Sequence, residues 1–285
     1  MKITVAIPVY NEEKYIASCL ESIMRGTRLP DEILVADGGS VDRTREIARE
    51  LGATVIPNPR KNAASGRNEC IKRATGDVIL FTDGDCVPKN DWVECYEKAF
   101  EVTRADGIGG KIIPAKPVND IEAYWCNLQL NIVMNFGDEP YWVTKRSLND
   151  AFITANCAFR RKFLCRMHGF NNWFANNGED VELCWRGLAK GARFYYCPNP
   201  VVEFHGVTSM KELRRKSMRN GVSSSKLQKV YGKFINYDVR IYKELFRTIK
   251  RVMRHEKWSW YNLNELIWHL LGKYVGSIKA GVINV

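Results

Sequence analysis

Two aspartates that flank a glycine follow a short apolar run. The run at 78–82 (Val-Ile-Leu-Phe-Thr) predicts a buried β-strand, because it is short, apolar and partly β-branched. Asp83, Gly84 and Asp85 come directly after it. In a parallel α/β sheet ligands bind beyond the carboxyl ends of the strands, and two carboxylates there suit a divalent cation such as Mg²⁺ or Mn²⁺. An ordinary turn after a strand is the alternative.

Another acid holds the same position after a second predicted strand. Asp37 follows the apolar residues 33–36 and begins a loop rich in glycine and serine. Because the carboxyl ends of parallel strands meet at one rim, we expect Asp37 near Asp83. It could accept hydrogen bonds from a nucleobase or ribose there, unless it is only a turn residue. Residues 8–12 follow the first predicted strand and lie on the same rim.

Two later stretches carry groups that could do chemistry. Glu179 and Asp180 follow Gly178 in the first turn of a predicted helix, where the dipole favours an ionised carboxylate. An ionised carboxylate beside a substrate hydroxyl can act as a general base, although acids are also common at helix starts. His205 ends an apolar run. A lone histidine is usually structural, but this one could complete a metal shell begun by Asp85.

Strands alternate with helices through the first half of the chain, which predicts a parallel sheet with crossover helices. Asn11 and Asp42 are predicted to cap two of the helices, and the third begins at Asn62. The later pattern predicts a loop at 137–149, and two prolines predict a turn near 198–200. The predicted strands are 3–7, 33–36, 54–56, 78–82, 107–114, 151–159 and 193–197, and the predicted helices are 12–26, 43–51, 62–74, 89–104 and 120–136.

The composition describes a globular protein. The chain has 285 residues, of which 45% are hydrophobic and 26% charged, enough for one large α/β domain or for one domain with an appendage. The sequence shows neither a signal-peptide pattern nor an apolar run of about 18 residues, so we expect a soluble or peripheral protein. Its nine cysteines form no Cys-x-x-Cys pair, which disfavours a zinc or iron–sulfur site and favours a cytoplasmic location.

The positive charge is concentrated at the C-terminus. Residues 206–285 contain 17 Lys and Arg against 5 Asp and Glu, a net charge of +12, whereas residues 1–205 carry −1, which gives +11 for the whole chain. Residues 211–257 predict two basic helices, and an apolar stripe follows from Leu263 to Ile278. Such helices could lie on an anionic membrane surface at the cytoplasmic face. They could equally pack on the rest of the chain or on a second subunit, which leaves a homodimer open.

In their order and spacing, these motifs resemble the family 2 glycosyltransferases, inverting enzymes of the GT-A fold. The resemblance covers residues 3–206 and rests on six motifs. These are PVYNEE (8–13), DGGSVDRT (37–44), GRN (66–68), FTDGD (81–85), GED (178–180) with Arg186, and His205. One departure concerns the second motif, where one of the two paired acids found in many relatives is either replaced by Ala36 or shifted by a glycine. The resemblance therefore leaves the nucleotide contact at this position open.

The resemblance implies a role for each matching residue. It implies that the nucleoside of the donor is held by Pro8, Tyr10, Glu12 and Asp37, and that Arg67 approaches the donor. Around the diphosphate it implies that Asp83 lies near the ribose and the metal, and that Gly84 leaves room for the donor. It also implies that Asp85 and His205 ligate Mn²⁺ or Mg²⁺. It implies that Asp180 is the catalytic base. The reaction would invert the anomeric carbon.

The resulting expectation is a GT-A catalytic domain at 1–206 and a basic, amphipathic helical extension at 207–285. Within the domain, 1–106 would bind the nucleotide and 107–206 the acceptor. The donor would be a UDP- or GDP-sugar, and the acceptor a glycan, lipid-linked or otherwise. Transfer to a polyprenyl phosphate itself is the nearest alternative. A sugar nucleotidyltransferase would need a glycine-rich, basic phosphate loop that PVYNEE lacks, and a nucleic-acid binder fits poorly with the near-neutral body.

Overall fold

The computed structural model describes residues 1–132, 136–147, 151–175, 177–232 and 238–281. The chain divides into two compact units. The first unit comprises residues 1–116, 129–175 and 179–205, and it contains the β-sheet. The second comprises 117–128, 176–178 and 206–285, and it is helical. Each unit is described by itself below.

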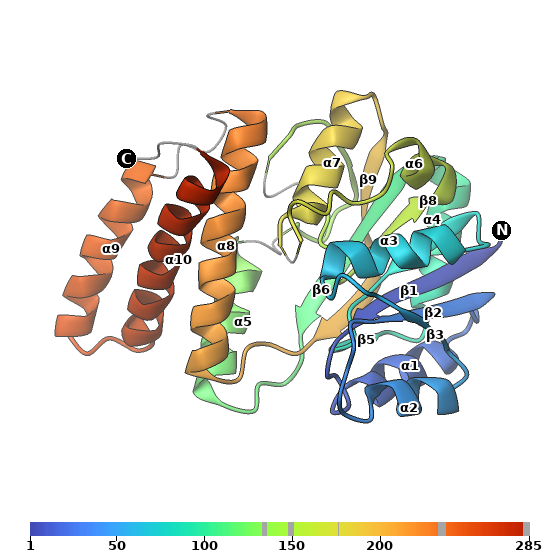
Figure 1. Ribbon diagram of the computed structural model, residues 1–285, viewed down its shortest axis with the longest axis horizontal. Helices are drawn as coiled ribbons and strands as arrows, with labels where there is room; N and C mark the ends of the chain where they lie inside the picture. Colours follow the sequence, from blue (N-terminus) through green and yellow to red (C-terminus); the bar gives the residue numbers. More distant parts are fainter. Residues whose placement is uncertain (133–135, 148–150, 176, 233–237, 282–285) are drawn as a thin grey trace. The chain divides into compact units, whose positions relative to one another are not determined.

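Over the described residues, one nine-stranded sheet forms the framework of the first unit (Figure 1). Its order is β3-β2-β1-β4-β8-β6-β9-β5, and β7 pairs with β9. The first four strands in this order are parallel, whereas β8 runs antiparallel to both of its neighbours. The strands are β1 (Ile3–Val9), β2 (Glu32–Asp37), β3 (Thr54–Pro57), β4 (Val78–Phe81), β5 (Cys86–Pro88), β6 (Gly107–Pro114), β7 (Tyr141–Val143), β8 (Cys157–Arg160) and β9 (Phe194–Phe204).

Helices connect and cover these strands. A buried apolar cluster packs residues of α3, α6 and α7 against the sheet, with Phe159, Phe163 and Phe194 in mutual ring contact. The helices are α1 (Ile16–Met24), α2 (Thr44–Glu50), α3 (Ala63–Arg73), α4 (Trp92–Thr103), α5 (Asp120–Ile132), α6 (Arg161–Arg166), α7 (Glu179–Ala189), α8 (Met210–Tyr231), α9 (Asp238–Met253) and α10 (Ser259–Ala280). None of the described helices is both long and apolar enough to cross a membrane.

The helix starts test the predicted caps. The third helix begins near Asn62 as predicted, and Asn62 is its cap, because its side chain accepts a hydrogen bond from the Ser65 amide at 2.9 Å. The prediction for Asn11 is wrong, since α1 begins only at Ile16. Asn11 instead has a φ of +55° and accepts a hydrogen bond from the Val41 amide at 2.9 Å. The chain after β1 is therefore held by the loop after β2.

The second half of the sheet departs further from the sequence pattern. The predicted strand at 151–159 is shortened to β8, and the predicted turn at 198–200 is wrong because β9 continues through both prolines. β7 lies inside the predicted loop at 137–149, whose last two residues lie outside the described chain, as do 133–135 of the predicted helix at 120–136. β5 and β7 are three residues long and both pair with β9, so tertiary pairing rather than local pattern stabilises them.

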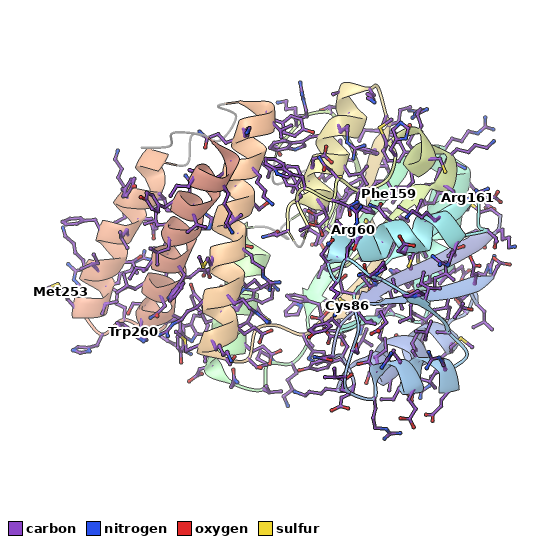
Figure 2. The ribbon with its side chains drawn as sticks, in the orientation of Figure 1. Arg60, Cys86, Phe159, Arg161, Met253 and Trp260 are labelled. Carbon is purple, nitrogen blue, oxygen red and sulfur yellow. The ribbon has the colours of Figure 1, made fainter. Side chains whose placement is uncertain are left out.

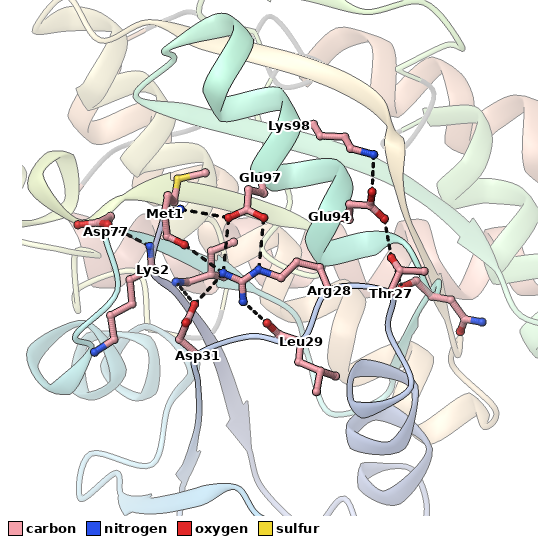
Figure 3. A network of polar contacts seen from close by, with 12 residues as sticks. Met1, Lys2, Thr27, Arg28, Leu29, Asp31, Asp77, Glu94, Glu97 and Lys98 are labelled. Carbon is pink, nitrogen blue, oxygen red and sulfur yellow. Dashed lines mark hydrogen bonds and ion pairs between the residues drawn. The ribbon is translucent and has the colours of Figure 1, made fainter.

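A polar network fixes the start of the chain in the first unit (Figure 3). Arg28, in the loop between α1 and β2, donates to Asp31 at 2.9 Å and to Glu97 of α4 at 3.3 Å. The amino group of Met1 contacts the same Glu97 at 3.2 Å. Arg28 also donates to the Met1 carbonyl at 3.0 Å. The network therefore ties the chain start and β2 to α4, and so fixes both β1 and β2, whose far ends carry candidate site residues.

Candidate active site

Asp37 lies at the rim where β1 and β2 end, as predicted. The register pairs it with Val9, so residues 8–12 lie beside it. Its carboxylate is buried and accepts hydrogen bonds from the amides of Gly39 at 3.0 Å and Ser40 at 3.1 Å. Asp37 therefore shapes its own loop. Tyr10 is exposed on the same rim, which leaves its ring accessible to a planar ligand.

A pocket of about 260 Å³ adjoins Asp37. Three cationic side chains contribute to it, so the pocket suits an anionic or hydrogen-bonding group. Its lining does not include Pro8, Tyr10 or Glu12, which were predicted to hold the nucleoside with Asp37. The lining residues are Asp37, Gly39, Arg45, Arg49, Val55, Ile56, Pro57, Asn58, Pro59 and Lys61.

Gly84 and Glu12 pack against each other behind the Asp83–Asp85 turn. A β-carbon at position 84 would lie 3.1 Å from Cγ1 of Val9 and 3.2 Å from Cγ of Glu12. The glycine thus allows the turn to approach the end of β1. The Glu12 amide donates to the Thr44 hydroxyl at 2.7 Å, which fixes this segment to the start of α2. Passage of a donor beside Gly84 stays a prediction.

Asp85 and His205 are brought together by β5 and β9. These strands pair antiparallel with Cys86 opposite Phe204, and the His205 amide donates to the Asp85 carbonyl at 3.1 Å. The His205 ring stacks on Tyr15, with 4.8 Å between ring centroids and 27° between planes. The two residues that the sequence suggested as metal ligands are therefore neighbours, although they are 120 positions apart in the chain.

Arg67 joins Asp83 to the start of α7. Its Nη2 lies 2.7 Å from Oδ1 of Asp83, and its Nη1 lies 2.6 Å from Oε1 of Glu179. Burial opposes the charge of Arg67, but the two carboxylates outweigh it and raise the pKa of the guanidinium. Nε of Arg67, Oε2 of Glu179 and the Thr82 hydroxyl are buried without a hydrogen-bond partner in the described part of the chain. Polar atoms in that state call for water or ligand at this place.

Asp180 follows Glu179 in the first turn of α7. Burial raises the pKa of Asp180 above its usual range, although its hydrogen bond from the Val181 amide, at 2.8 Å, and the charge of Arg67 oppose the shift. Burial also raises the pKa of Glu179 to about 7, despite the contact with Arg67. A carboxylate with a raised pKa is a stronger base than one in water, so both acids differ chemically from surface carboxylates.

The acids around Asp85 fit a divalent cation. Burial, followed by the negative charges of Asp85, Asp83 and Glu12, raises the pKa of the Cys19 thiol. Among the described residues, no group of three or more His, Cys, Asp and Glu is arranged to hold a metal. Mg²⁺ and similar ions are commonly held by one or two carboxylates together with substrate phosphates and water. Metal binding by Asp83, Asp85 and His205 stays a prediction.

Comparison with known proteins gives the family. Residues 4–166 match the model described as glycosyl transferase family 2. The chain belongs to glycosyl transferase family 2. Among its relatives, the glycosyltransferase AglE of Haloferax volcanii is 28% identical over 227 residues, which cover 77% of this chain and 71% of AglE. Another is a dolichyl N-acetyl-alpha-D-glucosaminyl phosphate 3-beta-D-2,3-diacetamido-2,3-dideoxy-beta-D-glucuronosyltransferase of Methanococcus voltae, 24% identical over 78% of this chain and 72% of its own.

Solved structures agree on the fold of this family 2 glycosyltransferase. The mannosyltransferase PcManGT of Pyrobaculum calidifontis, in complex with GDP-Man and Mn²⁺, superposes with a TM-score of 0.59 at 17% identity, covering 100% of this chain and 76% of that one. Glucosyl-3-phosphoglycerate synthase of Mycobacterium tuberculosis, in complex with Mn²⁺, UDP-Glc and phosphoglyceric acid, superposes with a TM-score of 0.55 at 18% identity, covering 80% and 78%. The predicted GT-A fold, a mixed α/β sheet flanked by helices, is confirmed.

Three residues near the site have contacts that the sequence did not predict. Glu179 was predicted with Asp180 as a possible general base or a helix-start acid, without its partner, and no site role was predicted for Tyr15 or Lys61. Their partners are Arg67, His205 and the pocket beside Asp37, and each partner is distant in the sequence or on another element. Only the charge of Glu179 beside Asp180 offered a signal in the sequence.

Proposed function

We propose that this family 2 glycosyltransferase transfers the sugar of a UDP- or GDP-sugar to a hydroxyl group of a lipid-linked glycan. The reaction would invert the anomeric carbon and require a divalent cation. The observation that carries the proposal is the pairing of β5 with β9, which sets Asp85 beside His205. Arg67 contacts Asp83 and Glu179 in the same unit, and Asp180 follows Glu179 directly. Arg67 thus connects the turn proposed to bind the donor with the helix that carries the proposed base.

In this proposal each residue has a limited task. Tyr10 and Asp37 position the nucleoside, and Asp83, Asp85 and His205 hold the cation. The cation, when bound, neutralises the negative charge that develops on the departing nucleoside diphosphate. The acceptor oxygen forms a bond to the anomeric carbon as the bond to the diphosphate breaks, and Asp180 takes the hydroxyl proton. A single displacement of this kind inverts the configuration.

The lipid-linked acceptor is supported by the relative of Methanococcus voltae, whose name describes a sugar on dolichyl phosphate. The basic C-terminal segment is compatible with work at an anionic membrane surface. The nine cysteines, all free thiols, fit the reducing cytoplasm and therefore the cytoplasmic face.

Calorimetric titration with a panel of nucleoside diphosphates tests the donor site. Binding of UDP or GDP should require Mn²⁺ and be abolished by EDTA. Asp85→Asn should weaken the metal-dependent binding at least about tenfold, whereas Asp91→Asn, an exposed acid before α4, should leave it unchanged. Equal binding with and without metal would contradict the metal-dependent proposal.

The catalytic base is tested once the donor is identified. Asp180→Asn should keep the affinity for the nucleotide and lower the rate of transfer at least about 100-fold. Analysis of the product then separates two acceptors, because a sugar joined directly to polyprenyl phosphate would replace the lipid-linked glycan in the proposal. An Asp180→Asn rate within threefold of wild type, on the order of experimental error, would exclude Asp180 as the base.

A further inference from the structure

In the second unit α8 and α10 cross so closely that their backbones are in contact. A β-carbon on Gly221 of α8 would lie 2.1 Å from the His269 carbonyl oxygen, and one on Gly272 of α10 would lie 2.1 Å from the Met218 carbonyl oxygen. The Ser225 hydroxyl donates to the Lys273 carbonyl at 2.9 Å in the same crossing. α10 thus buries its small residues against α8, so its large apolar residues must lie elsewhere.

Those large residues form an exposed row on α10. We call Ile267, Leu271, Tyr274 and Ile278 the α10 stripe, and their exposed fractions run from 42% to 66%. Their spacing of four, three and four residues keeps them on one side of the helix. Apolar side chains of this size are normally covered when they are contiguous in a monomeric soluble protein.

α9 carries a second row of the same kind. We call Tyr242, Phe246, Ile249 and Met253 the α9 stripe, and their exposed fractions run from 41% to 76%. The spacing is again four, three and four. The packed side of α9 is a different one, because Ile241 and Thr248 are buried and Thr248 contacts Asn262 of α10 at 3.1 Å. The α9 stripe therefore stays exposed when α9 packs on α10.

Basic side chains flank the α9 stripe. At 100° per residue they fall in the sector next to the stripe and away from the packed side. Glu244 contacts Arg247 at 3.6 Å and Arg251 at 3.7 Å, and Glu256 contacts Arg251 at 3.7 Å, so five positive charges face two negative ones. The exposed basic residues are Lys243, Arg247, Lys250, Arg251 and Arg254.

The end of the α9–α10 hairpin adds an exposed tryptophan. Trp260 is 57% exposed in the first turn of α10, and Figure 2 places it with Met253 at the end of the hairpin where α9 passes into α10. Lys257 lies over the Trp258 ring in the connection between the helices, at 4.6 Å from its centroid. Tryptophan and lysine together are typical of groups that lie at the boundary between lipid and water.

We propose that the α9 and α10 stripes are a docking surface for an anionic lipid bilayer. In that position the apolar stripes would enter the boundary between headgroups and acyl chains, while the basic sector of α9 contacts lipid phosphates. Charge decides between a bilayer and a second copy of the chain. A second copy would bring the same positive charges against each other, whereas an anionic bilayer neutralises them. Docking does not depend on the proposed transferase reaction.

Vesicle flotation of the full chain tests the surface. The protein should float with vesicles of phosphatidylcholine containing about a quarter phosphatidylglycerol, and should bind them at least about tenfold more strongly than pure phosphatidylcholine. Phe246→Glu should lower the partition coefficient about tenfold, because it places a charge in the apolar stripe. The matched control is Val102→Glu, an equally drastic change at an exposed position of α4 in the first unit, which should float like wild type.

Two further arms keep the result interpretable. Lys243→Gln with Lys250→Gln and Arg254→Gln should lower binding to the anionic vesicles about 100-fold, and roughly 0.5 M salt should have a similar effect on wild type. All variants should keep the wild-type thermal transition, because the changed side chains are exposed.

Two outcomes would overturn the proposal. The first is equal flotation of wild type and Phe246→Glu. The second is a wild-type dimer that Phe246→Glu converts to a monomer without vesicle binding by either form, which would assign the stripes to self-association. Nucleotide binding measured on the same samples keeps this test separate from the proposed reaction, since either can fail alone.

Discussion

Arg67 and Glu179, 112 residues apart in the sequence, form a buried ion pair with 2.6 Å between Nη1 and Oε1. The same guanidinium contacts Asp83 at 2.7 Å. Arg67 lies on α3, Asp83 follows β4, and Glu179 begins α7. The Arg67 side chain therefore links the end of β4 to α7, the helix that carries Asp180. Its removal should displace both.

Removing Arg67 should destabilise the protein strongly. Arg67→Met leaves the buried Glu179 without its partner, and loss of one member of a buried ion pair costs about 3–5 kcal/mol in the free energy of unfolding. Chemical denaturation of the full chain measures this loss in the free energy of unfolding. Arg73→Met on the same helix is the control, because Arg73 is exposed and its pair with the half-buried Glu69 contributes about 1 kcal/mol or less.

The double variant separates loss of the ion pair from independent losses of packing at the two positions. Arg67→Met combined with Glu179→Leu removes both charges and should recover part of the lost free energy of unfolding. Additive losses in the double variant would mean that the two side chains stabilise the fold independently, contrary to the geometry.

Glu179 should make stability depend on pH. Burial raises its folded pKa to about 7 from an ordinary value of 4.5. A group with a raised folded pKa stabilises the fold fully below its unfolded pKa, and this contribution is lost as the pH rises through the folded value. Relative to Glu179→Gln, the wild-type protein should therefore lose stability as the pH rises from 4.5 through about 7.

Unfolding curves of both proteins across this pH range measure the difference. The charge of Asp180 is one cause of the raised Glu179 pKa, so the difference between the two profiles reports the titration of the neighbouring pair. Glu101→Gln, on the exposed side of α4, should give the wild-type profile. Parallel profiles for wild type and Glu179→Gln would show that Glu179 stays ionised throughout.

His205→Phe should separate stacking from metal binding. A phenyl ring can keep the stacked contact with Tyr15, seen at 4.8 Å, but offers no nitrogen to a cation. The thermal transition should stay near that of wild type, while the Mn²⁺-dependent part of nucleotide binding falls about tenfold or more. His205→Ala should show both losses. Unchanged metal dependence in His205→Phe would assign His205 a purely structural role.

Gly272→Ala should disrupt the crossing of α8 and α10. The added β-carbon would meet the backbone carbonyl oxygen of Met218 at 2.1 Å, so the helices must move apart at a cost of about 3 kcal/mol. Gly191→Ala is the matched control in the first unit. Nothing lies within 4 Å of its β-carbon, and only its φ of +77° opposes alanine, at about 1 kcal/mol. Similar losses in thermal unfolding for both variants would contradict close packing of the helices.

Local pattern predicts the first half of the sheet well. β1, β2 and β4 are buried apolar runs followed by turn residues, and α3 has its cap in the sequence at Asn62. Such elements carry their own signal because burial and capping act within a few residues of the chain. The order of Asp37, Asp83 and Asp85 at strand ends follows from the same signal, as does the family to which the chain belongs.

The other contacts of the site depend on pairings between distant segments. β5 has three residues and no pattern of its own, yet its pairing with β9 brings His205 to Asp85. Arg67 could have pointed into solvent, as most arginines do, until α3 and α7 packed on one face and enclosed it with Glu179. The sequence determined which groups are present and where strands end. Only tertiary structure decided which of them meet, because ion pairs and strand pairings between distant segments form only where packing excludes water and fixes the backbones together.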